Sequence, residues 1–216
     1  MFKQSAFVGC SFTYGDALDD RQKSFPNLLG GINLGDRGAS NRQIFERAVQ
    51  ALIDHQQVVV QWTESGRGHF TNADVPIVMQ TDKEQWQPNF VVPKRLWHIF
   101  VDVFKIIQND FDDFTNIKKY VNILDSLAQH TNKKVFHING LMDIKTEYML
   151  PPFTQANKNY NSVLSFLDND KNWINTIDSL KTMIVDRGTD GRHPGEKSHR
   201  LFADMIVQYV DKKDKE

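Results

Sequence analysis

The stretch FVGCSFTYGD, residues 7–16, decides how the rest of this chain is interpreted. An apolar run ends at Gly9, Ser11 follows it, and a second glycine, Gly15, comes four residues after the serine. Such a run is typical of a buried strand. In an open α/β sheet, ligands bind at the edge formed by the carboxyl ends of the strands. The stretch therefore predicts a strand that presents the Ser11 hydroxyl at a binding edge. The plain alternative is a strand followed by a polar turn.

The composition is that of an ordinary globular protein. Of 216 residues, 40% are hydrophobic and 25% are charged, and the formal net charge is −1. This length predicts one domain over residues 1–216 with a sizeable core. The balanced charge and the absence of a long basic tract argue against a nucleic-acid partner. These features leave the oligomeric state open.

The cysteine usage and the N-terminal residues bear on the cellular compartment. Cys10 is the only cysteine in the sequence, so an internal disulfide and a cysteine metal cluster are excluded. No apolar run approaches the roughly 20 residues of a membrane span, and the first residues lack the apolar segment of a signal peptide. We therefore expect a soluble cytoplasmic protein without a membrane span. A viral or non-standard export context is compatible with the same features.

Apolar periodicity divides the chain into alternating strands and helices, which predicts an α/β domain with a mostly parallel sheet. The predicted strands cover residues 6–8, 32–34, 58–62 and 133–139, and the predicted helices cover residues 41–52, 96–109, 117–131, 173–183 and 195–210. Residues 25–29 are expected to form a short helix or a turn. Residues 63–94 are rich in glycine and proline and form an irregular insertion, in which residues 75–79 could hold a short strand or hairpin. The charged tail, residues 211–216, is expected to fray.

A second polar group lies near the C-terminal end. Asp190 and His193 are three residues apart in a turn, and Pro194 disfavours helical geometry at His193. An aspartate in this place can accept from Nδ1–H of the imidazole and fix its tautomer. A nucleophilic serine needs such a base, because its hydroxyl is a weak nucleophile at neutral pH. The pattern predicts that Ser11, His193 and Asp190 act together. The plain alternative is a solvated histidine beside a turn aspartate.

A third stretch, NLGDRGASN at residues 33–41, places a glycine between a strand and a helix. The N–H of Gly38 could point at an oxyanion beside Ser11. Ser40 or Asn41 can cap the helix that follows.

These three stretches, in this order, resemble the SGNH/GDSL hydrolase family. GCSFTYG, residues 9–15, is similar to the family's first block, with Ser11 at the nucleophile position. Residues 35–41 are similar to the second block, whose glycine (here Gly38) donates to the oxyanion. DGRHP, residues 190–194, is similar to the fifth block, which supplies the acid and base. The resemblance spans residues 6–204. It implies a three-layer α/β/α fold with a flavodoxin-like, mostly parallel five-stranded sheet of order 2-1-3-4-5, and a reaction that needs no metal and no cofactor.

One block departs from the family pattern. The family's third block carries an asparagine that is a second oxyanion donor, whereas this chain reads QWTESGR at residues 61–67. The hydroxyl of Thr63 or the charge of Arg67 could take that place, so we expect Thr63 at the oxyanion and Arg67 near the substrate. Asn41 is either a helix cap or a substrate contact at the start of its helix. Loss of one oxyanion donor typically lowers the rate ~10²–10³-fold.

The resulting prediction is a serine hydrolase that cleaves a carboxylic ester of a small molecule or a carbohydrate. Ser11 attacks the carbonyl, His193 transfers the proton to the leaving group, and an acyl-enzyme forms that water hydrolyses. Acyl groups on sugars, such as O-acetyl, are one substrate class that the resemblance implies; lipids, thioesters and aryl esters are others. The rival interpretation is a catalytically weak or inactive binding or structural module, for example in a viral particle or a polysaccharide-handling assembly.

Two other assignments of the reactive residues are less consistent with the pattern. Cys10 is a better nucleophile than serine in principle, but strand alternation points it away from Ser11, which predicts a buried structural thiol. Asp190, His193 and His199 could together bind a metal, but no second motif supports metal-ligand spacing.

Overall fold

The computed structural model describes residues 2–63, 68–72, 75–79, 110–141, 172–175 and 179–213. Arg67, the helix predicted over residues 96–109 and most of the 63–94 insertion lie outside these described residues.

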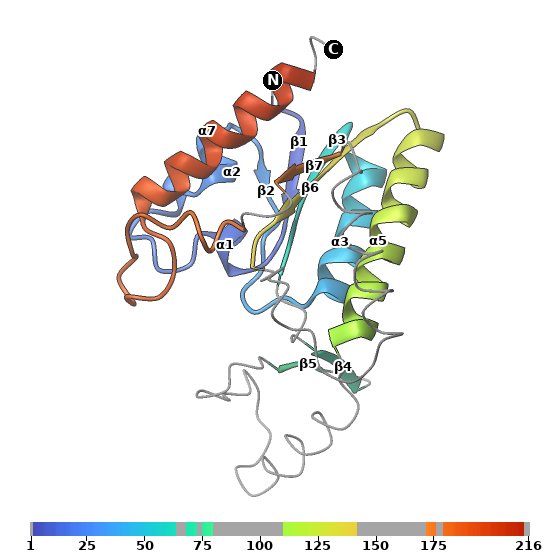
Figure 1. Cartoon of the computed structure of the whole chain (residues 1–216), viewed down its shortest axis with the longest axis horizontal. Coiled ribbons are helices and arrows are strands. Elements are labelled where there is room, and N and C mark those ends of the chain that lie inside the picture. Colours follow the sequence, from blue (N-terminus) through green and yellow to red (C-terminus); the bar gives the residue numbers. More distant parts are fainter. Residues whose placement is uncertain are drawn as a thin grey trace, which may run out of the picture.

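A parallel sheet forms the centre of the molecule (Figure 1). Its five strands are β1 (Ser5–Val8), β2 (Ile32–Asn33), β3 (Gln57–Trp62), β6 (Lys134–Asn139) and β7 (Trp173–Asn175). They lie in the order β2-β1-β3-β6-β7, and each neighbouring pair is parallel. The predicted order 2-1-3-4-5 is thereby confirmed. Three consecutive valines suit β3, because a central parallel strand is covered on both faces.

Helices cover both faces of the sheet and give the predicted three-layer arrangement (Figure 1). One face packs against α3 (Asn41–Asp54) and α5 (Asp110–His130). The short helices α1 (Ser11–Tyr14) and α2 (Phe25–Leu28) lie with α7 (Glu196–Lys213) on the other. Ser40 is the N-cap of α3 and forms a capping box with Gln43, so Asn41 is the first helical residue rather than the cap.

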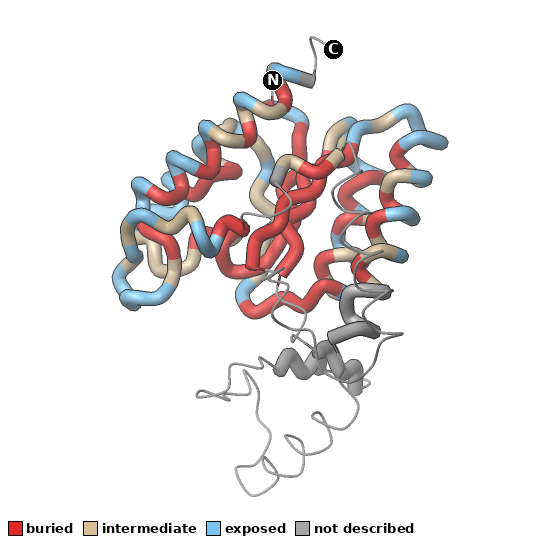
Figure 2. The backbone as a smooth tube through the Cα atoms, viewed as in Figure 1, coloured by how far each residue is buried: buried red, intermediate tan, exposed pale blue. Residues whose placement is uncertain are grey.

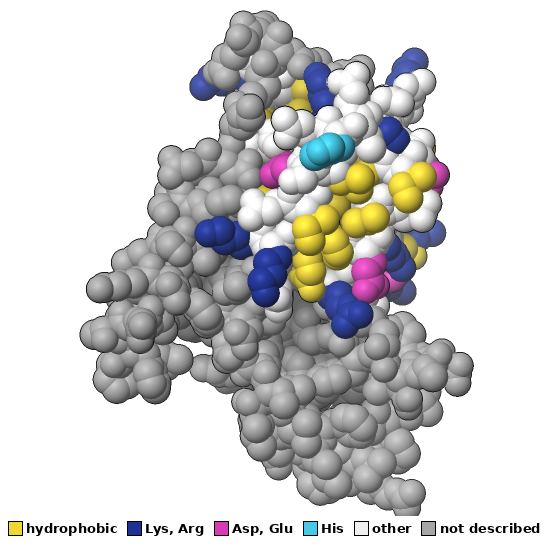
Figure 3. All heavy atoms as spheres, turned by 90° about the vertical axis from the view of Figure 1, so that its right-hand side faces the viewer, with side chains coloured by type: hydrophobic (Ala, Val, Ile, Leu, Met, Phe, Trp, Pro, Cys, Tyr) yellow, Lys and Arg dark blue, Asp and Glu magenta, His cyan; other side chains and the backbone are white. Residues whose placement is uncertain are grey.

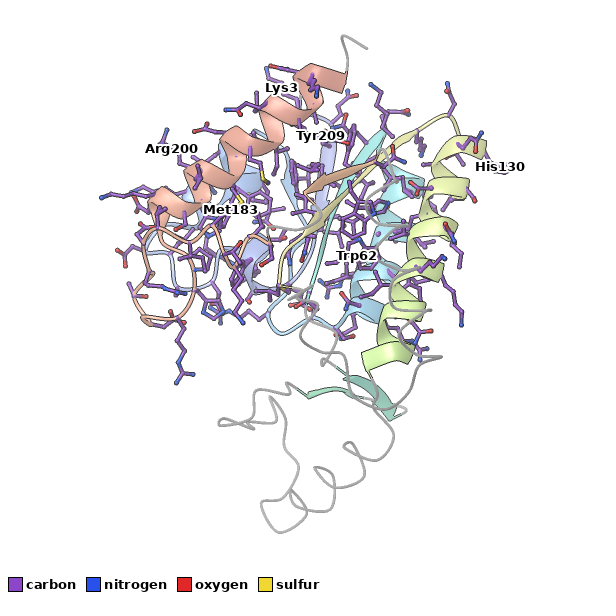
Figure 4. All side chains as sticks on the ribbon, in the orientation of Figure 1. Lys3, Trp62, His130, Met183, Arg200 and Tyr209 are labelled. Carbon is purple, nitrogen blue, oxygen red and sulfur yellow. The ribbon has the colours of Figure 1, made fainter. Side chains whose placement is uncertain are left out.

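Aromatic side chains pack in both interfaces between sheet and helices, and the strands β1, β3 and β6 are almost entirely buried (Figure 2). On one side, Phe7 of β1 contacts Phe25 edge to face, and Phe25 contacts Phe202 of α7 in the same way. On the other side, Trp62 projects from β3 toward α3 and α5 (Figure 4) and stacks on Tyr120. Alternate residues of a strand thus serve opposite layers, as the pleat requires.

Two segments differ from the elements predicted for them. Residues 173–183 carry apolar residues at helical spacing, but they hold the strand β7 followed by turns at residues 180–183. The reason is tertiary: Trp173 pairs with β6 and packs on His137, which fills the sheet edge that a helix would leave open. The last helix continues to Lys213, into the segment that was expected to fray.

Within the 63–94 insertion, the described residues form an antiparallel hairpin of β4 (Gly68–Asn72) and β5 (Val75–Met79). The second of these is the short strand that the sequence suggested. The insertion follows the carboxyl end of β3, and on that ground the sequence predicts that it forms one wall of the substrate site; most of its residues lie outside the described ranges.

The outer side of α3 and α5 is a mixed surface. Seen from that side, charged side chains surround a small group of hydrophobic ones (Figure 3). Of the residues of these two helices whose burial is described, Ile53 and Ile123 are the most exposed large hydrophobic ones. None of the described helices has the length and apolar character needed to cross a membrane.

Candidate active site

Ser11 begins the helix α1, immediately beyond the carboxyl end of β1. The residue is buried, and its hydroxyl lies 4.0 Å from the sulfur of Cys10. Its backbone N–H precedes the first helical turn and finds no hydrogen-bond acceptor among the described residues. Ser11 therefore combines a hydroxyl with a free N–H donor at the edge of the sheet where ligands bind.

Gln61 of β3 holds the segment that leads to Ser11. Its buried Oε1 accepts from the Cys10 N–H at 3.2 Å, from the Cys10 thiol at 3.4 Å and from the Thr13 hydroxyl at 2.9 Å. Its Nε2 donates to the Trp62 carbonyl at 2.8 Å, so both ends of the amide are engaged. A Cβ at Gly9 would lie 2.7 Å from Oε1, which explains a glycine at that position. Cys10 is thus a buried thiol held by Gln61.

Asp190 and His193 form a contact pair in the loop before α7. Oδ2 of Asp190 lies 2.5 Å from Nδ1 of His193, and Oδ1 accepts from the backbone N–H groups of Arg192 and His193. Partial burial by itself raises the pKa of Asp190, but the hydrogen bonds from His193 and Arg192 outweigh it and lower this pKa to about 2. Asp190 is therefore ionised near neutral pH, and it leaves Nε2 of His193 as the nitrogen that can exchange a proton with another group.

This loop is docked onto the segment that follows α1. The Ala17 carbonyl accepts from the Thr189 N–H at 2.9 Å and from the Thr189 hydroxyl at 3.1 Å. The ring of Phe12 lies edge to face with that of His193, 6.2 Å between centroids. In the part of the chain that the structure describes, no hydrogen bond joins the Ser11 hydroxyl to His193 directly. The segment that begins at Ser11 and the loop that carries His193 are therefore held together by the contacts of Ala17 with Thr189 and of Phe12 with His193.

Asp16 is a further carboxylate at this junction. Its Oδ2 lies 4.0 Å from Nε2 of His193, and its Oδ1 pairs with Arg37 at 2.6 Å. The Asp16 N–H donates to the Ser11 carbonyl at 3.0 Å, so this carboxylate belongs to the same turn of chain as the serine.

Gly38 lies in the turn between β2 and α3, which is the place between a strand and a helix that the sequence indicated. Its φ is +67°, a conformation that favours glycine over other residues. The turn is attached to the first block through the Asp36 N–H, which donates to the Gly9 carbonyl at 2.9 Å. The N–H of Gly38, like that of Ser11, has no acceptor within the described ranges.

Thr63 and Asn41 are joined across the carboxyl end of β3. The Thr63 N–H donates to Oδ1 of Asn41 at 2.9 Å, and Nδ2 of Asn41 donates to the Thr63 carbonyl at 3.1 Å. Both residues are buried, and the Thr63 hydroxyl has no hydrogen-bond partner among the described residues. A buried hydroxyl without a partner is unusual and calls for an explanation. Asn41 thus fixes the backbone that carries this hydroxyl.

Sequence reasoning missed Gln61 and Asp16. Gln61 did carry a signal, because a glutamine stands inside an otherwise apolar strand. Asp16 carried none, since its contacts to His193 and Arg37 depend on how three loops pack. Among the described residues, no group of three or more His, Cys, Asp or Glu side chains is arranged to hold a metal ion.

Comparison with known proteins identifies the fold. No protein-family model matches the chain, and no curated protein matches it. Among solved structures, it is similar to a GDSL-like lipase from Bacteroides thetaiotaomicron VPI-5482, with a TM-score of 0.52 and 15% identity over 98% of this chain and 89% of that one. A putative acylhydrolase from Bacteroides fragilis NCTC 9343 gives a TM-score of 0.52 and 16% identity over 98% and 88%. The α/β fold that the sequence predicted is therefore the fold of these GDSL-type structures.

Proposed function

We propose that this chain is a serine hydrolase that cleaves a carboxylic ester through Ser11, His193 and Asp190. The observation that carries the proposal is the Asp190–His193 pair, 2.5 Å between Oδ2 and Nδ1, held against the segment that begins at Ser11. A carboxylate on Nδ1, together with an Nε2 that makes no hydrogen bond among the described residues, is what a general base for a serine requires. The shared fold with a GDSL-like lipase and a putative acylhydrolase supports the same class of reaction by analogy.

The reaction follows from these roles. Nε2 of His193 takes the proton as Oγ of Ser11 attacks the ester carbonyl, and the carbonyl oxygen becomes an oxyanion. Collapse of this intermediate breaks the bond to the alkoxy group, which leaves as an alcohol with the proton from Nε2. Water, activated by the same nitrogen, then hydrolyses the acyl-enzyme and restores Ser11.

Three hydrogen-bond donors are available for the oxyanion. The N–H groups of Ser11 and Gly38 lack acceptors among the described residues, and the Thr63 hydroxyl is buried without a partner. A donor that is desolvated and unpaired in the free enzyme gains its first partner as the oxyanion forms, which favours the transition state over the ground state. We assign the position of the family's missing asparagine to Thr63, held by Asn41.

The substrate class that we propose is an ester of a small molecule or a carbohydrate, O-acetyl sugars included. Arg67 is proposed as a substrate contact because it follows β3 closely in sequence. The reaction as written requires no metal or other cofactor.

Hydrolysis of p-nitrophenyl acetate by the wild type and Ser11→Ala tests the proposal. The loss of the nucleophile should lower the rate ~10⁴-fold or more. Ser126→Ala, an exposed serine of α5, is the matched control and should keep the wild-type rate. A fluorophosphonate should add covalently to Ser11 in the wild type and not in Ser11→Ala. Equal rates and no labelling would overturn the proposal.

A second function, binding without turnover, is favoured by one observation. In the described structure the Ser11 hydroxyl contacts Cys10 Sγ at 4.0 Å and makes no hydrogen bond to His193. This second function predicts that the wild type binds an acetylated polysaccharide and releases no acetate from it. Acetate release that depends on Ser11 would decide for the hydrolase.

A further inference from the structure

We infer that Asp16 is a positioning residue of this site, a second carboxylate that stabilises His193 in its protonated form. The inference rests on the proposed function, because it assigns Asp16 a part in the proton transfer from Ser11. Asp16 lies outside the three stretches that resemble the family's blocks, and none of the roles assigned above belongs to it.

The contacts of Asp16 direct one of its oxygens at His193. Arg37 at 2.6 Å and the Ala17 N–H at 3.2 Å both engage Oδ1. Oδ2 is left on the side of His193, 4.0 Å from Nε2. The imidazole thus lies between two carboxylates, with Asp190 at one nitrogen and Asp16 at the other.

The position of Asp16 is set by the same turn that holds the nucleophile. The Ser11 carbonyl accepts from the N–H groups of Gly15 and Asp16, at 3.0 Å each. The carbonyl of the next residue, Ala17, accepts two hydrogen bonds from Thr189, which belongs to the loop that carries Asp190 and His193. Asp16 therefore keeps its distance to both Ser11 and His193 fixed, as a group acting on proton transfer between them must.

The titratable and charged groups around His193 come from four elements. Asp190 belongs to its own loop and Asp16 to the turn after α1. Arg37, on the turn before α3, pairs with Asp16, and His199 of α7 is uncharged near neutral pH, because burial lowers its pKa to about 4. The Phe12 ring is an uncharged neighbour of the imidazole. A negative charge at Nε2 favours imidazolium, and Arg37 partly offsets that charge. As the proton moves from Ser11 to Nε2, Asp16 stabilises the cation that forms.

This arrangement predicts shifts of opposite sign for two variants. Asp16→Asn removes the negative charge beside Nε2, so the acid limb of the kcat/KM profile should move to lower pH, and the plateau should fall up to about threefold. Arg37→Gln leaves the Asp16 charge without its partner, so the acid limb should move up. Damage to the fold would not give opposite shifts.

An NMR titration of the His193 ring in the same variants gives a readout that needs no substrate. Glu46→Gln, which removes the carboxylate of the exposed pair with Arg42 at 3.0 Å, is the control and should titrate as the wild type. Coincident His193 titrations in the wild type, Asp16→Asn and Arg37→Gln would overturn the inference. If Ser11→Ala keeps full activity, the proposed function fails instead, and the titration still decides whether Asp16 acts on His193.

Discussion

The side-chain carbonyl of Gln61 accepts a hydrogen bond from the backbone N–H of Cys10 at 3.2 Å, which ties the centre of the sheet to the residue before Ser11. The same oxygen accepts a hydrogen bond from the hydroxyl of Thr13, one helical turn further along. Gln61 thus holds both ends of the short segment on which the serine lies. In a parallel sheet this is an effective support, because β3 is the central strand and Gln61 is buried on it.

We predict that Gln61→Leu lowers both stability and activity. Its loss leaves the Cys10 N–H and the Thr13 hydroxyl buried without acceptors, at about 1–3 kcal/mol each in the free energy of unfolding. Urea denaturation and ester hydrolysis measure the two effects. Gln57→Leu is the matched control. Gln57 lies on the same face at the other end of β3, and its Nε2 has no partner within the described ranges, so this change should not destabilise the protein. Equal effects of the two variants would contradict the prediction.

Thr63→Val should separate activity from stability. The valine has the shape of threonine, and the hydroxyl it removes is buried and unpaired, so the free energy of unfolding should stay constant or rise by up to about 1 kcal/mol. If Thr63 donates to the oxyanion, kcat/KM should fall ~10²–10³-fold.

The comparison variant is Thr13→Val, which removes a hydroxyl that donates to Gln61 at 2.9 Å. This change should lower the free energy of unfolding by about 1 kcal/mol. Wild-type hydrolysis by Thr63→Val would exclude Thr63 from the oxyanion site, and the orphaned hydroxyl would then have another cause.

The parts of the fold and site that sequence reasoning found are those encoded locally. Asp190 and His193 are three residues apart, so one turn brings them together, and β3 is recognisable from its valines alone. Gln61 reaches a residue 51 positions away and Asp16 a histidine in another loop, and no local pattern reports such contacts. The strand at Trp173 was wrongly predicted as helix for the same reason, since its partner β6 decides its conformation.

Asp190→Asn should affect activity and acid stability together. Loss of the carboxylate releases the tautomer and orientation of His193, so kcat should fall on the order of 10³–10⁴-fold. The pKa of Asp190 is lowered to about 2 in the folded chain from its ordinary value of 3.8, so the stability it contributes is present above about pH 4. That contribution should disappear as the pH falls from about 4 to about 2.

Urea denaturation of the wild type and Asp190→Asn at pH 5 and pH 2.5 measures this loss. The difference in unfolding free energy between the two proteins should be largest at pH 5 and should shrink at pH 2.5. A difference that is the same at both values would show that Asp190 is not held in its ionised form by its neighbours.

His199 should make the protein less stable in mild acid. Its side chain is fully buried, Nδ1 accepts from the Phe25 N–H at 3.2 Å, and Nε2 has no hydrogen-bond partner in the described part of the chain. Burial lowers the pKa of His199 to about 4, against an ordinary value of 6.5. Between these values the unfolded chain binds a proton that the folded chain does not, so stability is lost as the pH falls from about 6.5 to about 4. The expected loss between pH 7 and pH 5 is about 2 kcal/mol in the free energy of unfolding.

His199→Asn keeps an acceptor near Phe25 and should abolish this pH dependence, even though the smaller side chain lowers stability at pH 7. His130→Asn, at an exposed position on α5, should keep the wild-type dependence. Urea denaturation of the three proteins at pH 7 and pH 5 checks this, and an unchanged slope in His199→Asn would assign the acid sensitivity to another group.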